Sequence, residues 1–205
     1  IVGAGMVGAA TALGLARAGL KVALVEHNPV APPQPADPVD LRVVAIAPHA
    51  QRLLSELGVW QQIAAVRASP YARMQAHDAL GGSRIGFDAA DYGWPCLGHI
   101  VENRLVAGVL WRAVEREPGV RLLLGDALRG FDLDTASVRL RLESGGTLQA
   151  KLLVGADGVH SRVREQLLIG VEGAAYGQSG LVAHIDLEHP QHELAWQRFL
   201  PSGPL

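Results

Sequence analysis

The spacing of apolar positions changes several times along this 205-residue chain, and each change predicts a new element of secondary structure. Apolar residues recur at roughly helical spacing over residues 7–18, and Gly19 ends that pattern. A continuous apolar run over residues 22–25 follows and closes on Glu26, as is typical of a buried strand. Ile1 and Val2 precede a glycine-rich turn, so the first 26 residues predict a strand, turn, helix and strand in that order.

The middle of the chain departs from this simple alternation. Five prolines between residues 28 and 40 exclude a helix or a central strand there, and a helix is expected from residue 48 to about residue 58. Residues 71–76 and 83–87 alternate in strand fashion around an expected Gly81-Gly82 hairpin turn. This pattern predicts the start of a second, antiparallel layer.

The rest of the chain is expected to add elements first to the first layer and then to the antiparallel layer. A helix is expected over residues 104–117, followed by a buried parallel strand over residues 120–124. Further strands are expected at 127–133, 137–143 and 147–151 as a small β meander, at 152–156 as a short apolar strand, and at 180–187 and 195–200 in the antiparallel layer. The fold class expected is therefore α/β, with a Rossmann-like domain and part of an antiparallel sheet.

Composition narrows the functions that this fold could carry. The chain has 18 basic and 20 acidic residues, a net charge of -2, and its basic residues are dispersed, so no nucleic-acid partner is expected. Its single cysteine, Cys96, excludes an internal disulfide and fits a reducing compartment, and no His/Cys set has metal-site spacing. No apolar run reaches the length of a membrane span, so a soluble or peripherally attached protein is expected. Both ends interrupt strand-like segments, and we interpret the chain as a fragment.

The glycine-rich turn carries the first chemical signal. Gly3 permits a tight turn, Gly5 lets backbone N–H groups approach a pyrophosphate, and Gly8 lets helix and strand pack closely. Glu26 follows Gly5 by 21 positions, close to the spacing of an acidic residue that binds the adenosine ribose hydroxyls. A carboxylate there repels a ribose phosphate, so the turn predicts FAD or NAD rather than NADP.

A second signal follows the apolar run at residues 152–156. Asp157 and Gly158 stand where ligands bind in open α/β sheets, at the carboxyl ends of strands. Asp157 can accept from a ribose or a bound water, and Arg162 and Arg164 can reach phosphates or pair with Glu165. The alternative is a strand-to-helix turn with an Asp cap and solvated arginines, and spacing alone leaves both interpretations open.

Several stretches together resemble a known family, the aromatic-ring hydroxylases of ubiquinone biosynthesis. These are single-component FAD monooxygenases related to para-hydroxybenzoate hydroxylase. The resemblance spans nearly the whole chain and is carried by residues 3–8, 40–42, 98–104, 155–164 and 195–201. It implies FAD rather than NAD as the bound cofactor. It also implies an FAD-binding domain over residues 1–70 and 101–175, and a substrate domain that begins at 71–100 and continues at 176–205.

The resemblance also implies roles for individual residues. Gly3, Gly5, Gly8 and Glu26 hold the ADP half of FAD, Arg42 and Arg104 lie along its pyrophosphate and flavin side, and Asp157 and Gly158 serve both FAD and transient NAD(P)H. A structural ion pair is the alternative for each of the two arginines. Trp196, Arg198 and Phe199 could line the substrate chamber, although ordinary sheet packing explains the two aromatic residues equally well. No catalytic acid or base is nominated, because the flavin carries the chemistry.

The implied activity is hydroxylation of a polyprenylated phenol or benzoquinol, with NAD(P)H and O₂ as co-substrates. Such a substrate resides in the membrane, so the expected location is cytoplasmic, with peripheral contact to the inner membrane or to a biosynthetic complex. The family's later Gly-Asp segment, which contacts the riboflavin part, does not occur in these 205 residues. Two alternatives stay open: an FAD-dependent reductase or dehydrogenase on the same scaffold, and a nonenzymatic flavin-binding or assembly subunit.

Overall fold

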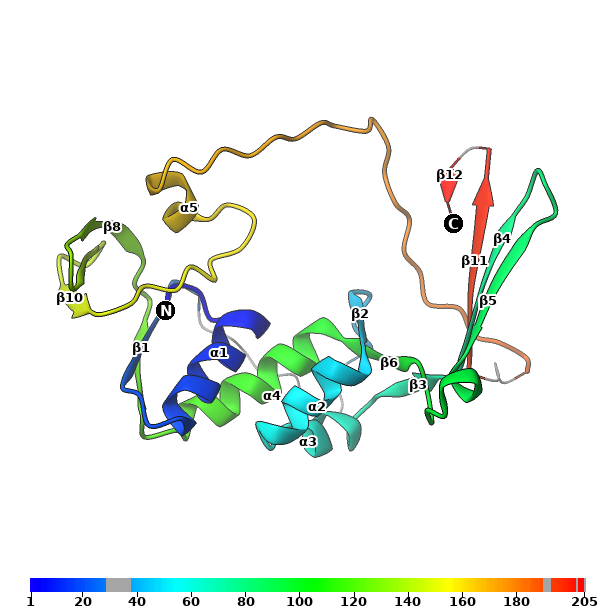
Figure 1. Ribbon diagram of the computed structural model, residues 1–205, viewed down its shortest axis with the longest axis horizontal. Coiled ribbons are helices and arrows are strands. Elements are labelled where there is room, and N and C mark those ends of the chain that lie inside the picture. The colour runs from blue at the N-terminus through cyan, green and yellow to red at the C-terminus, as the bar shows by residue number, and fades with distance from the viewer. Residues whose placement is uncertain (29–37, 190–192, 202, 205) are drawn as a thin grey trace. The chain divides into compact units, whose positions relative to one another are not determined.

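The computed structural model describes residues 1–28, 38–189, 193–201 and 203–204, which form two compact units (Figure 1). The first unit takes residues 1–35 and 104–180, and the second takes residues 36–103 and 181–205. The domain limits drawn from the sequence at residues 70, 100 and 175 stay a prediction. In the structure, residues 38–70 belong to the same compact unit as residues 71–103.

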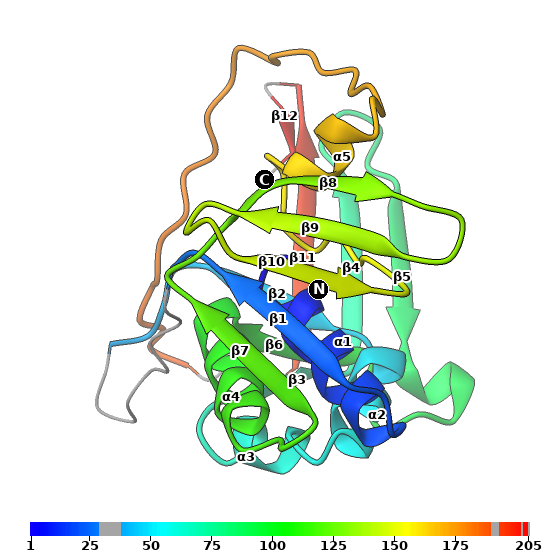
Figure 2. The same cartoon turned by 90° about the vertical axis from the view of Figure 1, so that its left-hand side faces the viewer.

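The first unit begins with the predicted strand, turn, helix and strand. Helix α1 (Met6–Arg17) and strand β1 (Val22–Glu26) lie within one residue of the expected limits. Strand β7 (Val120–Leu124) pairs parallel with β1 in the register Val22 to Val120, and Figure 2 shows the two strands side by side. Helix α1 buries mainly small residues, which let it approach the strands closely. Val2 forms parallel bridges to Val25 and to Gly155.

The expected β meander is confirmed, and it forms a three-stranded sheet within the first unit. Strands β8 (Leu128–Leu133), β9 (Val138–Leu142) and β10 (Thr147–Ala150) are antiparallel, with β9 in the centre. Their buried positions meet the start of the chain and the short helix α5 (Arg162–Gln166) in one apolar cluster, formed by Val2, Leu128, Val138, Leu140 and Val163. This cluster fixes the glycine turn beside the segment that carries Asp157.

Two expectations for the first unit need correction. Helix α4 (Asn103–Glu115) agrees with the prediction, but β7 has no fully buried residue, although its apolar sequence predicted a buried strand. Residues 152–156 do not form a strand, because only Gly155 pairs, through its bridge to Val2. The backbone N–H of Val2 still donates to the Val154 carbonyl, and the N–H of Ala156 to the Val2 carbonyl. Residues 152–156 therefore run beside Val2 but form no continuous ladder of hydrogen bonds with it.

The second unit contains two sheets. Strand β6 (Gly98–Glu102) lies between β2 (Val43–Ile46) and β3 (Ser69–Tyr71), and both pairings are antiparallel. Between β2 and β3 the chain forms helix α2 (Pro48–Glu56), which begins at the expected proline, and helix α3 (Trp60–Ala64).

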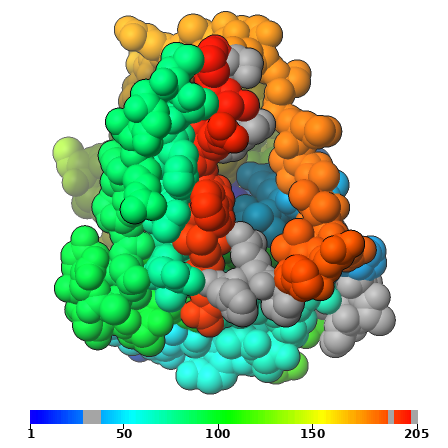
Figure 3. Space-filling view, turned by 90° about the vertical axis from the view of Figure 1, so that its right-hand side faces the viewer, coloured from blue at the N-terminus to red at the C-terminus, as the bar shows by residue number. Residues whose placement is uncertain are grey.

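The second sheet contains the predicted hairpin. Strands β4 (Arg73–Asp78) and β5 (Arg84–Asp88) are antiparallel, and the short helix η1 (Ala89–Tyr92) follows β5. Strand β11 (Leu194–Leu200) lies along β4, as the green hairpin and the red strand in Figure 3 show, and its other neighbour is β12 (Gly203–Pro204). β11 runs parallel to β4, so the layer is mixed rather than wholly antiparallel.

The strand expected at residues 180–187 is wrong. These residues have no strand partner, and Leu181 and Ile185 are 95% and 80% exposed despite their apolar side chains. Most of the proline-rich loop expected at residues 28–40 lies outside the described residues. Within the described residues, no helix is long and apolar enough to cross a membrane. The same residues contain no group of three or more His, Cys, Asp or Glu side chains that could hold a metal ion.

Candidate dinucleotide-binding site

The turn between Val2 and α1 is packed too tightly for side chains at two of its glycines. Gly3 has a φ of +93°, and a Cβ atom there would lie 2.4 Å from the carbonyl oxygen of Ala156. A Cβ atom on Gly8 would lie 1.9 Å from the carbonyl oxygen of Gly3. Both distances are far below van der Waals contact, so these glycines are required by the packing of the turn, of α1 and of the segment at Ala156.

Gly5 differs from its two neighbours because it faces open space. It is the N-cap of α1, with φ -62° and ψ -177°, and a Cβ atom there would meet no atom within 4 Å. No side chain caps the helix, and no acidic residue lies in its first turn. The unpaired N–H groups at the start of a helix attract anions, so the open space beside Gly5 suits a phosphate group.

Glu26 ties the glycine turn to the end of β1. Its Oε2 accepts a hydrogen bond from the backbone N–H of Ala4 at 2.6 Å, and its Oε1 accepts one from Asn28 at 2.8 Å. The first bond reaches back 22 residues and holds the turn against the strand end. Each carboxylate oxygen can accept a further bond, so Glu26 can still receive ribose hydroxyls. The spacing predicted only the ribose role and missed the structural one.

Asp157 organises the loop that leads into α5. Its carboxylate accepts from the Ser161 hydroxyl at 2.6 Å and from the backbone N–H groups of Arg162 and Val163 at 2.7 and 3.2 Å. These bonds match the capping alternative that the sequence left open. The adjacent Gly158 has a φ of +80°, and a Cβ atom there would meet no atom within 4 Å, so its backbone faces open space.

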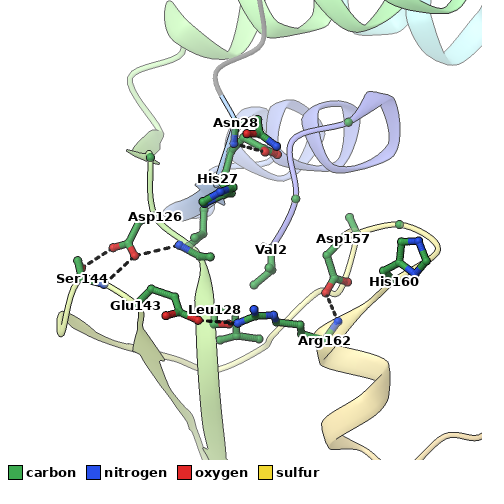
Figure 4. A pocket seen from close by; sticks show the side chains of 18 residues that line it. Val2, His27, Asn28, Asp126, Leu128, Glu143, Ser144, Asp157, His160 and Arg162 are labelled. Atoms are coloured by element: carbon green, nitrogen blue, oxygen red, sulfur yellow. Dashed lines mark hydrogen bonds and ion pairs between the residues drawn. The ribbon is translucent and has the colours of Figure 1, made fainter.

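The opposite wall comes from the strand ends of β7 and β9, and sequence reasoning missed it (Figure 4). Asp126 accepts from the Ser144 hydroxyl at 2.6 Å and from the N–H groups of Ala127 and Ser144 at 2.9 and 3.1 Å. The hydroxyl bond, more than the backbone bonds, lowers the pKa of the Asp126 carboxyl, against an opposing effect of desolvation. Asp126 is the second residue after the parallel strand β7, and this position at a strand end is a signal that the sequence did offer.

The arginines near α5 pair differently from the expectation. Arg162 donates to Glu143 Oε1 at 2.6 Å and to the Leu128 carbonyl at 3.0 Å, which links α5 to the meander (Figure 4). Arg164 donates to the carbonyl of Val159 at 2.6 Å. Neither contact is the expected pair with Glu165, and both arginines brace the loop that carries Asp157.

These residues surround one pocket of about 800 Å³ within the first unit. That volume suits a large cofactor fragment. The pocket is lined by the glycine turn, by the ends of β1, β7 and β9, and by the loop before α5: Val2, Gly3, Gly5, Val25, Glu26, His27, Asn28, Gly125, Asp126, Ala127, Leu128, Glu143, Ser144, Ala156, Asp157, Gly158, His160 and Arg162.

The pocket therefore brings together five of the eight residues expected to bind cofactor. Gly8 lies inside α1, where its lack of a side chain allows the turn to pack against the helix. Arg104 is the second residue of α4 and does not line the pocket. Arg42 belongs to the second unit, where its carbonyl accepts from the Asn103 N–H at 2.9 Å and its own N–H donates to Asp40 Oδ1 at 3.2 Å.

A glycine turn open to an anion, a carboxylate at the end of the next strand and a large pocket between them define a dinucleotide-binding protein. Comparison with known families agrees, because the family described as "FAD binding domain" matches residues 1–201. The chain belongs to this FAD-binding family, as the sequence resemblance implied.

Individual relatives give a narrower picture. The chain is 38% identical over 204 residues to the 3-demethoxyubiquinol 3-hydroxylase of Escherichia coli, covering 100% of this chain and 52% of that protein. It is 33% identical over 205 residues to the ubiquinone hydroxylase UbiL of Rhodospirillum rubrum, covering 100% of this chain and 47% of that protein. The chain thus spans about half the length of these curated relatives.

Solved structures support the fold. The p-nitrophenol 4-monooxygenase PnpA of Pseudomonas putida matches with a TM-score of 0.65 and 24% identity, over 81% of this chain and 42% of that chain. The flavin-dependent monooxygenase PieE, solved in complex with FAD and substrate, matches with a TM-score of 0.65 and 23% identity, over 84% of this chain and 32% of that chain. Both comparisons show the same fold.

Proposed function

We propose that this chain is the cofactor-binding part of an FAD-dependent monooxygenase that hydroxylates the aromatic ring of a polyprenylated phenol or benzoquinol in ubiquinone biosynthesis. NAD(P)H and O₂ are the proposed co-substrates. The observation that carries the proposal is the open pocket beside Gly5, with Glu26 on its wall. The relatives named as ubiquinone hydroxylases support the substrate class.

The residues present fit the ADP half of FAD. Gly5 leaves free the space that a Cβ atom would take, at the start of a 12-residue helix that attracts a pyrophosphate. Gly3 and Gly8 give the turn its shape, and Glu26 keeps acceptor capacity for the ribose hydroxyls. We assign these four residues to the adenosine diphosphate, and Gly158 to a close backbone approach.

Other assignments rest on the resemblance rather than on the pocket. Arg42 and Arg104 are proposed to serve the pyrophosphate and flavin side, and Asp157 to serve FAD and NAD(P)H by holding its loop in shape. When bound, FAD supplies the redox chemistry that joins NAD(P)H oxidation to insertion of an oxygen atom from O₂. The chain's own contribution is to bind and orient the cofactor, while substrate enclosure involves the second unit, where Trp196, Arg198 and Phe199 are candidates.

The proposed substrate partitions into membranes because of its prenyl chain. Peripheral contact with a membrane, or with a ubiquinone-biosynthesis complex, is therefore part of the proposal. The relatives' names support a quinol substrate and say nothing of such contacts.

The full-length protein provides the test in two arms. Purified protein is expected to show a flavin absorbance band, and Glu26→Ala to lower its FAD occupancy, whereas Glu117→Gln, which removes a surface ion pair with Arg17, is the matched control. A deletion strain is expected to accumulate a quinone precursor that the wild-type gene clears and the Glu26→Ala gene clears poorly. Absence of the flavin band, or an unchanged precursor profile on deletion, would contradict the proposal.

A further inference from the structure

The sheet formed by β4, β5, β11 and β12 has two chemically different faces. Strand β4 lies between β5 and β11, and residues that pair across neighbouring strands carry their side chains on the same face. His77 pairs with Arg84 of β5 and with Arg198 of β11. These basic residues therefore form one row across three strands, and Trp196 lies on the same face two positions before Arg198. We call the face that carries these four residues the cationic face.

The opposite face of this sheet is mostly apolar. The register places on it the side chains of Met74, Ala76, Ile85, Phe87, Ala195 and Phe199. Trp196, Arg198 and Phe199 are all candidates for the substrate chamber, but alternation along β11 separates Phe199 from the other two. One wall of a chamber cannot include all three residues, so Trp196 and Arg198 require a different partner from Phe199.

The charges on the cationic face are not balanced within the sheet. Two strand spacings separate Arg84 from Arg198, about 10 Å, a distance over which like charges still repel each other at physiological salt. Both arginines are exposed, and neither forms an ion pair with a residue that the structure describes. Among the described residues of the four strands, the one carboxylate on this face is Asp88, which pairs with Arg73, four positions from His77. The row of basic residues is therefore complementary to an external anionic surface.

Trp196 adds an aromatic ring beside these charges. Its ring stacks on that of His77, with ring centroids 4.9 Å apart and an angle of 11° between the planes. His77 Nε2 in turn lies 3.3 Å from Gln75 Oε1. Trp196 is nevertheless 58% exposed, so much of its surface still meets solvent. An indole with an apolar ring and a polar N–H is typical of the zone where lipid headgroups meet hydrocarbon.

We propose that the cationic face is the surface by which this protein docks on a membrane that contains anionic lipids. Arg84 and Arg198 contact the lipid phosphates, and the exposed part of Trp196 enters the zone between headgroups and hydrocarbon. A second copy of the chain is disfavoured as the occupant, because two cationic faces repel each other. The inference rests on the proposed function, since a membrane-resident substrate supplies the reason for docking.

Vesicle binding by the full-length protein tests the two arginines. The wild type should bind vesicles of phosphatidylcholine and phosphatidylglycerol, and should lose that binding at high salt or on phosphatidylcholine alone. Each arginine near an anionic surface contributes a factor of about five, so Arg84→Gln/Arg198→Gln should lower the partition coefficient about thirtyfold. The matched control is Arg121→Gln/Arg139→Gln, which removes the same charge from exposed positions of β7 and β9 in the first unit. Its partition coefficient should stay within about twofold of the wild type.

Tryptophan fluorescence tests the aromatic contact. Lipids with brominated acyl chains quench the fluorescence of a tryptophan that reaches them. Vesicles that contain such lipids should quench the wild type, and Trp196→Phe should lose most of this quenching. Trp94→Phe is the control, because Trp94 is 50% exposed in the same unit but lies outside the four strands, and it should be quenched like the wild type.

Thermal unfolding tests the electrostatic argument without any lipid. Because Arg84 and Arg198 form no ion pair with a described residue, their removal relieves repulsion and breaks no such contact. The Tm of Arg84→Gln/Arg198→Gln should therefore equal or slightly exceed that of the wild type. A lower Tm would show that the two arginines stabilise the sheet, and it would overturn the inference.

The binding experiments can overturn it as well. A wild type that does not bind anionic vesicles, or binds them only when another protein is present, would do so. Equal losses in the two double arginine variants, or unchanged quenching in Trp196→Phe, would have the same consequence. In all these cases the flavin band of the wild type is still present and the proposed function stands. A wild type without a flavin band would overturn the proposed function and this inference together.

Discussion

A methyl group added at Gly5 and one added at Gly8 are expected to have opposite consequences, although both glycines belong to the same turn. The Gly5 Cβ position is open and its backbone conformation suits alanine. Alanine is a poorer N-cap than glycine by roughly 0.5–1 kcal/mol, but it lowers the entropy of the unfolded chain by a similar amount. The stability of Gly5→Ala should therefore stay within about 1 kcal/mol of the wild type.

Gly8→Ala is expected to destabilise the fold itself. Its Cβ atom would lie 1.9 Å from the Gly3 carbonyl oxygen, so α1 or the turn must move. Overpacking costs about 3 kcal/mol at such a site, and better helix propensity returns about 1 kcal/mol. A net loss of about 2 kcal/mol corresponds to a fall in Tm of about 4–8 °C for a domain of this size.

Although Gly5→Ala should change stability little, it should weaken the binding of FAD. If the pyrophosphate approaches its backbone, the added methyl group costs about 1–3 kcal/mol, or roughly 5- to 150-fold in the Kd for FAD. The assay combines thermal unfolding of the apoprotein with a fluorescence titration of FAD. Gly170→Ala is the matched control, because Gly170 also has open space at its Cβ position and does not line the pocket. Wild-type FAD affinity in Gly5→Ala, or wild-type stability in Gly8→Ala, would refute this reasoning.

Three further predictions concern capping and titration. Asp157→Ala should destabilise the apoprotein by about 1–2 kcal/mol in a denaturant titration, because three hydrogen bonds to the loop before α5 are lost; an unchanged midpoint would contradict this role. Burial lowers the pKa of His99 below its usual 6.5, so the folded state binds the proton less readily than the unfolded state. Stability should therefore fall as the pH drops below about 6.5, and His99→Phe should flatten that part of a Tm-against-pH curve; a curve of unchanged slope in this variant would contradict the prediction. Ser144→Ala should raise the pKa of Asp126 in an NMR titration, since the hydroxyl bond is the largest cause of its lowering; no rise would show that the bond is absent in solution.

Elements with a strong local pattern were predictable from the sequence. The helix at α1 and the strand at β1 have regular apolar spacing and a glycine boundary, and their limits agree within one residue. The β meander was predictable in the same way, because its turn residues are visible in the sequence. The strand expected at residues 180–187 has a similar apolar character but no partner, and a strand needs a partner that its own sequence cannot specify.

The site, too, was predictable only where it depends on local sequence. The glycines and Glu26 were found because their spacing reflects a local βαβ geometry. The bonds from Glu26 to Ala4, from Arg162 to Glu143 and from Glu102 to Asp40 join residues 19 to 62 positions apart, and only the folded chain brings them together. The parallel pairing of β11 with β4 was hidden for the same reason.

The most direct test of the central proposal follows the oxygen atom. The full-length protein, loaded with FAD and supplied with NAD(P)H and a prenylated phenol, would be incubated under ¹⁸O₂ and the product analysed by mass spectrometry. A ring hydroxylase is expected to yield a product that carries one ¹⁸O atom from O₂. A product without ¹⁸O, formed while NAD(P)H is consumed, would contradict the account and identify a reductase or dehydrogenase on the same scaffold.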